Sequence, residues 1–141
     1  MKLKLLHVQG RGAPLEECVH LSVVEDCDLG HYQILDTTKF ANGMISNKAR
    51  HYLWLPSIQV KAGDTVIVYT GVGTNRSVPV SLSNQVHFAY WQLGRPVWND
   101  DGDTAVLQYV PEWETAKVNA PPLALTLAAL AQFNRVGAQA R

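Results

Sequence analysis

Hydrophobic and polar residues alternate along most of the chain up to residue 110. In residues 17–24, Val19, Leu21 and Val23 share one side of an extended backbone, and Cys18, His20 and Ser22 share the other. A period of two is typical of a strand with one buried face. The pattern and its β-branched and aromatic content predict strands at residues 2–8, 17–24, 29–36, 51–55, 65–70, 86–93 and 104–110.

Turn residues separate these segments. Gly63 and Gly102 stand where the chain must reverse and are expected to adopt positive φ. Asp64 and Asp103 follow them, and each is expected to accept backbone N–H groups two residues further on. Short strands and frequent turns predict an all-β fold, an antiparallel β-sandwich. Large aromatic side chains are expected to fill the space between its sheets: Tyr32, Trp54, Trp91 and Trp98.

Two segments depart from this pattern. Residues 71–83, rich in Gly, Ser, Asn, Val and Pro, predict a long loop, and long loops often carry function. Asn75 and Arg76 are its candidate binding residues, with a passive connection as the alternative. Residues 123–133 predict an α-helix that is apolar on most sides and must bury more than one of them. Its candidate contact residues are Leu123, Leu127 and Leu130.

These boundaries divide the chain into a β-domain at 1–111 and a linker with a C-terminal helical appendage at 112–141. The apolar helix either packs on its own domain or forms an interface with a second copy, which would make the protein a homo-oligomer. Residues 112–120 are interpreted as the linker.

The amino-acid composition limits the classes of function that this chain could have. Hydrophobic residues make up 47% and charged residues 17%, as in a globular domain. Twelve basic residues balance twelve acidic ones, and this balance argues against nucleic acid as a partner, since phosphate binding favours a basic excess. The apolar start of the chain is too short for a signal peptide and no stretch is long enough to span a membrane, so the expected location is the cytoplasm. Cys18 and Cys27 are expected to be reduced.

The chemical constellations in the sequence are sparse. Asp100, Asp101 and Asp103 form an acidic turn that is a candidate calcium site, with a solvated turn as the alternative. The five histidines lack the close spacing of a zinc site, and the G-x-S-x-G motif of serine hydrolases is missing. Glycine-rich phosphate loops followed by a helix are missing as well. No cofactor and no catalytic residue is therefore predicted.

Three stretches resemble the lamin-tail domain, an immunoglobulin-like sandwich. Asp28–Asp36 (DLGHYQILD) is similar to the family's first aromatic strand, with Tyr32 at the aromatic position and His31 where glycine is usual. Leu55–Gly73 (LPSIQVKAGDTVIVYTGVG) is similar to its glycine turn and following strand, and Trp98–Gln108 (WNDDGDTAVLQ) to its closing strand. The resemblance implies an immunoglobulin-like fold, protein partners and, in lamins, chromatin.

The leading hypothesis is a non-catalytic interaction module that binds an unidentified protein and associates with itself through the C-terminal helix. The alternative is a calcium- or zinc-dependent binding protein or enzyme accessory domain, with the acidic turn or the histidines as ligands.

Overall fold

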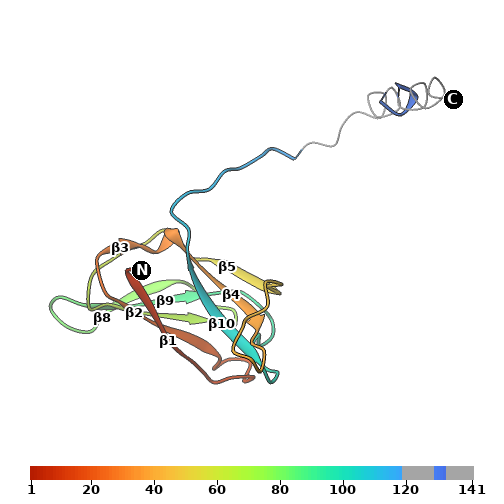
Figure 1. Cartoon of the computed structure of the whole chain (residues 1–141). Coiled ribbons are helices and arrows are strands. Elements are labelled where there is room, and N and C mark those ends of the chain that lie inside the picture. Colours follow the sequence, from red (N-terminus) through yellow and green to blue (C-terminus); the bar gives the residue numbers. More distant parts are fainter. Residues whose placement is uncertain (119–128, 133–141) are drawn as a thin grey trace.

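Ten strands, one 3-10 turn and a helical turn at residues 129–132 make up the secondary structure of the computed structural model, which describes residues 1–118 and 129–132 (Figure 1). The fold is therefore all-β, as predicted. All seven predicted strands are present, and three short strands come in addition. The elements are β1 (Leu3–Gln9), β2 (Cys18–Val23), β3 (Cys27–Asp28), η1 (Leu29–His31), β4 (Tyr32–Thr38), β5 (His51–Trp54), β6 (Gln59–Val60), β7 (Thr65–Tyr69), β8 (Arg76–Pro79), β9 (Gln85–Tyr90) and β10 (Asp103–Tyr109).

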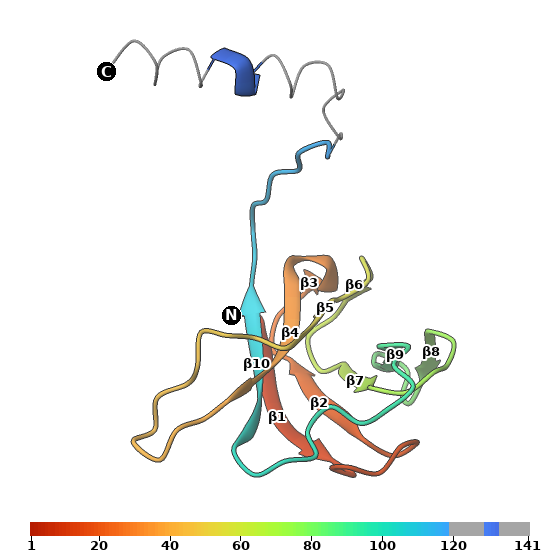
Figure 2. The same ribbon diagram turned by 90° about the vertical axis from the view of Figure 1, so that its right-hand side faces the viewer.

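The strands form three sheets. The largest has the order β1-β2-β7-β9-β8, the second has the order β10-β4-β5, and β3 pairs with β6 in a two-stranded sheet. β1 and β10 lie side by side where the two larger sheets meet (Figures 1 and 2). At the opposite side, β8 and β5 are the free edges of these two sheets.

The segment predicted to be a loop, residues 71–83, contains a strand, so that prediction is wrong. β8 lies inside it and pairs antiparallel with β9. The chain leaves β7, skips one strand position, runs back as β8 and then returns as β9 between the two. β7 and β9 consequently run parallel, which departs from the purely antiparallel sheet expected. The paired edge of β9 provides the backbone partners that this polar, proline-containing segment needs to become a strand.

The core lies between the two larger sheets. Val19, Leu21 and Val23 of β2 are all buried, as their alternation predicts, and so are Val66 and Val68 of β7. Tyr32, Trp91 and Trp98 belong to the same core. Burying a large aromatic side chain here contributes on the order of 2–3 kcal/mol each to folding.

Trp54 is a correction, because its side chain is 43% exposed and does not fill the core. It alternates with Leu53 on β5, and Leu53 is the residue that packs against the core. Tyr52 is two residues away, on the same face of β5 as Trp54, and is 58% exposed, so this face of the strand is turned towards solvent.

The two predicted turn glycines have the expected conformation, with φ of 91° at Gly63 and 84° at Gly102. The aspartates that follow these glycines were predicted to accept N–H groups from later residues, but they accept N–H groups from earlier residues. Asp64 accepts the N–H of Lys61, and Asp103 accepts that of Asp100, in each case three residues earlier. The carboxylates therefore close the turns that precede the strands.

Candidate functional site

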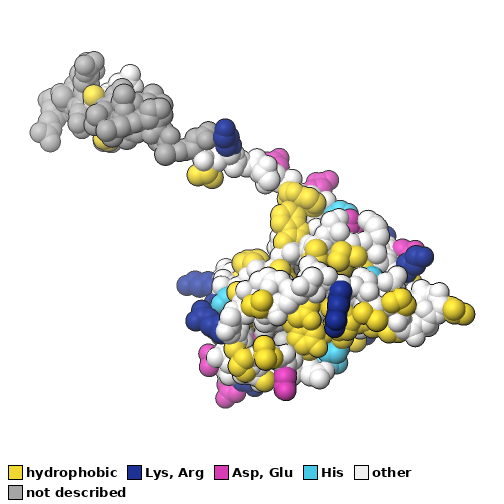
Figure 3. Space-filling model, turned by 180° about the vertical axis from the view of Figure 1, so that it is seen from behind, with side chains coloured by type: hydrophobic (Ala, Val, Ile, Leu, Met, Phe, Trp, Pro, Cys, Tyr) yellow, Lys and Arg dark blue, Asp and Glu magenta, His cyan; other side chains and the backbone are white. Residues whose placement is uncertain are grey.

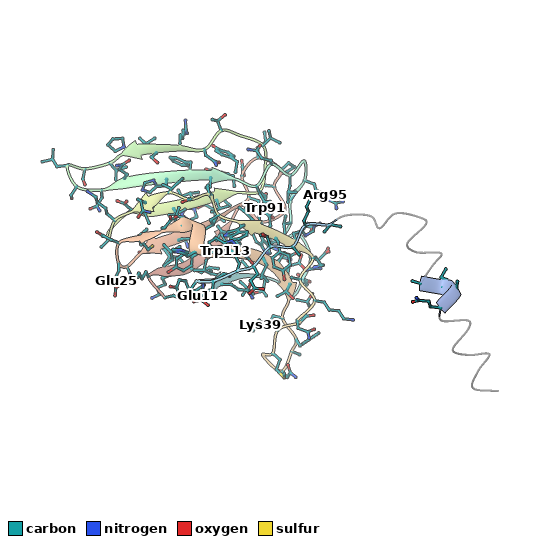
Figure 4. The ribbon with its side chains drawn as sticks, turned by 90° about the horizontal axis from the view of Figure 1, so that it is seen from above. Glu25, Lys39, Trp91, Arg95, Glu112 and Trp113 are labelled. Atoms are coloured by element: carbon teal, nitrogen blue, oxygen red, sulfur yellow. The ribbon has the colours of Figure 1, made fainter. Side chains whose placement is uncertain are left out.

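An aromatic corner forms where the chain leaves the β-domain. We use this name for Trp54, Trp113 and His31. Trp54 is the last residue of β5, His31 ends η1, and Trp113 follows β10 in an extended segment. Hydrophobic side chains gather around the start of the C-terminal segment in Figure 3, and Trp113 lies over the domain in Figure 4.

The two indoles meet at right angles. Their ring centroids are 4.7 Å apart with an interplanar angle of 88°, and the His31 ring lies 6.1 Å from that of Trp113. The Trp54 indole N–H donates to the Gly30 carbonyl at 2.6 Å, which fixes its ring. Although they pack on each other, Trp54 is 43% and Trp113 50% exposed, so much of both rings remains open to solvent.

A small cavity of about 250 Å³ opens beside the aromatic corner. Besides the three rings, it is lined by Asp28, Gly30, Leu55 and Ser57. The Asp28 carboxylate accepts the Gly30 N–H, the Ser57 hydroxyl and the side-chain amide of Gln59. These donors are neutral, so they orient the carboxylate without cancelling its charge.

The environment of the cavity is negative. The Gly30 N–H, followed by the Ser57 hydroxyl, holds the pKa of Asp28 below its usual range, and the carboxyl is therefore ionised at neutral pH. Glu112 and Glu114 flank Trp113 on its segment and are exposed. Within residues 1–118, no lysine or arginine nitrogen lies within 4.0 Å of Asp28. The site thus combines open aromatic faces with three carboxylates, and the charge interaction with His31 also contributes to the lowered pKa of Asp28.

Sequence reasoning missed this site. It assigned Trp54 to the core and residue 113 to a linker. The available signal was Trp113, an isolated tryptophan between two glutamates, because large aromatic side chains are uncommon in linkers.

The predicted binding residues Asn75 and Arg76 lie elsewhere, at the β8 edge of the largest sheet. The Arg76 guanidinium stacks over the Phe88 ring, with Cζ 4.9 Å from its centroid. The Asn75 side-chain oxygen accepts the N–H of Tyr90 at 2.9 Å. Both residues therefore brace β8 against β9, and they form no common site with the aromatic corner.

The predicted acidic turn is held by arginines. Asp101 pairs with Arg11 at 3.1 Å on the surface. Asp103 is almost fully buried and pairs with Arg50, which also reaches Asp36 at 3.0 Å. Burial alone would raise the pKa of Asp103, but the Asp100 N–H and Arg50 outweigh it and lower the pKa. Asp100 is exposed, and residues 1–118 and 129–132 contain no cluster of three side chains suited to a metal ion.

Two of the predicted helix contacts, Leu123 and Leu127, lie outside the described residues. Leu130 belongs to a helical turn at residues 129–132, and its side chain is 56% exposed. In the part of the chain that is described, no helix is long and apolar enough to cross a membrane.

Comparison of the chain with protein-family models, curated proteins and solved structures finds no match.

Proposed function

We propose that this protein is an interaction module that binds a cationic side chain of a protein partner at the aromatic corner. The observation that carries the proposal is the pair of half-exposed, perpendicular indoles of Trp54 and Trp113. Tryptophan is enriched among the residues that dominate binding energy at protein interfaces. A domain that exposes two of them in contact maintains a costly apolar surface for which partner binding is the direct explanation.

The charge of the site selects the partner chemistry. Indole faces attract cations, and the interaction contributes roughly 0.5–2 kcal/mol, depending on how far the cation is desolvated. Asp28 adds an ionised carboxylate whose hydrogen-bond donors are all neutral. An arginine or lysine side chain meets both requirements, whereas an anionic or nucleic-acid ligand would meet repulsion from Asp28, Glu112 and Glu114.

The lamin-tail resemblance and an immunoglobulin-like sandwich belong to this proposal. The three resembling stretches contact one another: β4 pairs with β10 over seven residues, and β3 pairs with β6. This arrangement supports the resemblance, because the motifs would otherwise be independent turn sequences. Self-association through a C-terminal helix, with Leu123, Leu127 and Leu130 as contacts, completes the proposed architecture.

The test uses the indole N–H resonances of the ¹⁵N-labelled full chain. Acetyl-arginine amide and tetramethylammonium chloride are titrated, with sodium acetate at equal ionic strength as the anionic counterpart. Both cations are expected to shift the Trp54 and Trp113 signals, and acetate is not. Trp113→Ala is expected to abolish the shift at Trp54, because the variant lacks one of the two indole rings of the aromatic corner.

Tyr52→Ala is the matched control, since Tyr52 is 58% exposed on the same strand but does not line the cavity. It is expected to leave the titration unchanged. If neither cation shifts the two indole signals, or if Trp113→Ala shifts like the natural chain, the aromatic corner only anchors the segment after β10 and the proposal fails.

A further inference from the structure

Two side chains of the largest sheet and one from the turn before β7 form a continuous hydrogen-bonded line. The Ser77 hydroxyl lies 2.7 Å from Nδ1 of His87, and Nε2 of the same ring lies 2.9 Å from Oδ2 of Asp64. Ser77 is exposed, whereas His87 and Asp64 are 4% and 3% exposed. Serine, imidazole and carboxylate in this order are the components of an activated nucleophile.

Strand register creates the contact between Ser77 and His87, which face each other in the β8–β9 pair. The N–H of Val80 donates to the carbonyl of Asn84. Val80 and Asn84 continue the β8–β9 register and are therefore a hydrogen-bonded pair. Hydrogen-bonded and non-hydrogen-bonded pairs alternate along antiparallel strands, and Ser77–His87 is three positions away, so it is a non-hydrogen-bonded pair. Side chains approach most closely in such pairs, and the Ser77 backbone N–H points away from β9 along the free edge of the sheet.

The Asp64 carboxylate determines which ring nitrogen of His87 carries the proton. Its carboxylate also accepts the N–H groups of Lys61 and Gln85 and the side-chain amide of Asn84. Burial alone would raise the pKa of Asp64, but these bonds and the one from His87 hold it far below its usual range. An ionised carboxylate only accepts, so Nε2 of His87 must donate to it. In the neutral ring, Nδ1 is then left with a lone pair directed at the Ser77 hydroxyl.

We propose that Ser77 is a nucleophile activated by His87 and Asp64, and that it transfers acyl groups from small polar carboxylic esters. This activity goes beyond the proposed binding function and runs against the expectation of a non-catalytic domain. The ring acts through Nδ1, with the carboxylate on Nε2, so the two ring nitrogens exchange the roles they have in chymotrypsin-type enzymes.

The Ser77 oxygen attacks the ester carbonyl carbon while its proton moves to Nδ1 of His87. The tetrahedral intermediate then expels the alcohol, which takes that proton and leaves acyl-Ser77. Water repeats the sequence in reverse, giving the free carboxylic acid and the serine. The outward-pointing N–H of Ser77 is positioned at the edge of β8 to donate to an oxyanion on a substrate that approaches from solvent.

The class of ester follows from a cavity of about 670 Å³ that Asp64 and Pro79 line, although Ser77 and His87 do not themselves line it. Pro79 is two residues from Ser77 and therefore on the same face of β8. Most of the other lining residues are polar, with Lys61, Asn84 and Gln85 among them. Such walls favour an acyl group that carries hydrogen-bonding substituents over a fatty chain.

The test treats the full chain with a biotinylated fluorophosphonate and locates the label by peptide mass spectrometry. Ser81 and Ser83 are exposed on the same hairpin and contact no imidazole among the described residues, so they serve as internal controls. Ser77 is expected to react about 100-fold faster than either, the usual scale of general-base assistance. Ser77→Ala is expected to remove the label, and His87→Gln to slow labelling by a similar factor.

Labelling of Ser77 at the rate of Ser81 and Ser83, or no labelling at all, would overturn the proposal. That comparison is made within one molecule and needs no variant, so it holds even if His87→Gln does not fold. With p-nitrophenyl acetate as substrate, a folded Ser77→Ala variant that keeps the full esterase rate would also overturn it. Cation binding at the aromatic corner is measured separately and can succeed or fail independently.

Discussion

The buried carboxylate of Glu17 accepts the backbone N–H of Val97 at 2.6 Å, joining segments 80 residues apart in sequence. The same side chain also accepts the N–H groups of Trp98 and Gly12. Glu17 is 1% exposed and precedes β2, so it ties the entry to β2 to the segment that leads into β10. The connection keeps Trp98 in the core.

Glu17→Ala is therefore expected to lower the free energy of unfolding by about 3 kcal/mol, because it leaves buried N–H groups without acceptors. Glu17→Gln keeps one acceptor oxygen and is expected to cost less. Urea denaturation followed by tryptophan fluorescence measures both. Glu16→Ala is the control, since Glu16 is exposed. Equal stability of Glu17→Ala and the control would show that water replaces the carboxylate.

Acid titration provides a second prediction. Burial alone would raise the pKa of Asp64 above its ordinary value of 3.8. Hydrogen bonds from Lys61, His87, Gln85 and Asn84 outweigh burial and lower the pKa. A depressed carboxyl pKa stabilises the fold fully above 3.8, and this contribution is lost as the pH falls below that value. The difference in unfolding free energy between the natural chain and Asp64→Asn is thus expected to be constant near neutral pH and to shrink below pH ~4.

Denaturation at a series of pH values measures this difference. Asp100→Asn, which changes an exposed acid, is expected to show no such trend. A difference for Asp64→Asn that does not change with pH would contradict the prediction.

Gly73 makes a third prediction possible. A Cβ atom at this position would overlap the ring of Tyr90, which stacks on Tyr69 with centroids 5.3 Å apart. Gly73→Ala is expected to destabilise the domain by about 1–3 kcal/mol, the usual scale for overpacking. Gly94→Ala is the matched control, because no atom lies within 4 Å of its added Cβ.

The double variant Gly73→Ala with Tyr90→Ala separates steric overlap from backbone strain. Removing the ring is expected to relieve most of the cost of the added methyl group, which a double-mutant cycle of melting temperatures would show. If the two effects simply add, the overlap is not the cause.

A fourth prediction concerns self-association. The full chain is expected to form an oligomer through Leu123, Leu127 and Leu130, and a chain cut after Glu114 to be monomeric. The cut retains Trp113 and hence the aromatic corner. Light scattering coupled to size exclusion measures both masses. If both chains are monomeric and equally stable, the C-terminal segment has no interface role.

Seven of the ten strands, and most of their buried positions, could be predicted from the amino-acid sequence alone. Alternation is a local property of the sequence. In an extended chain, alternate apolar residues lie on one face and are buried together, as is the case for Val19, Leu21, Val66 and Val68. The turns at Gly63 and Gly102 were readable for the same reason, since positive φ is tolerated mainly by glycine.

The order of the strands in the sheets could not be predicted in this way. β9 inserts between β7 and β8, and this places His87 opposite Ser77 and within reach of Asp64. Trp54 is exposed because it lies on the face of β5 turned away from the core, and Trp113 reaches it because β10 and β5 both run antiparallel to β4 and end at the same end of the sheet. Both groupings depend on strand order and register, which are set by the packing of the whole core and leave no trace in local periodicity.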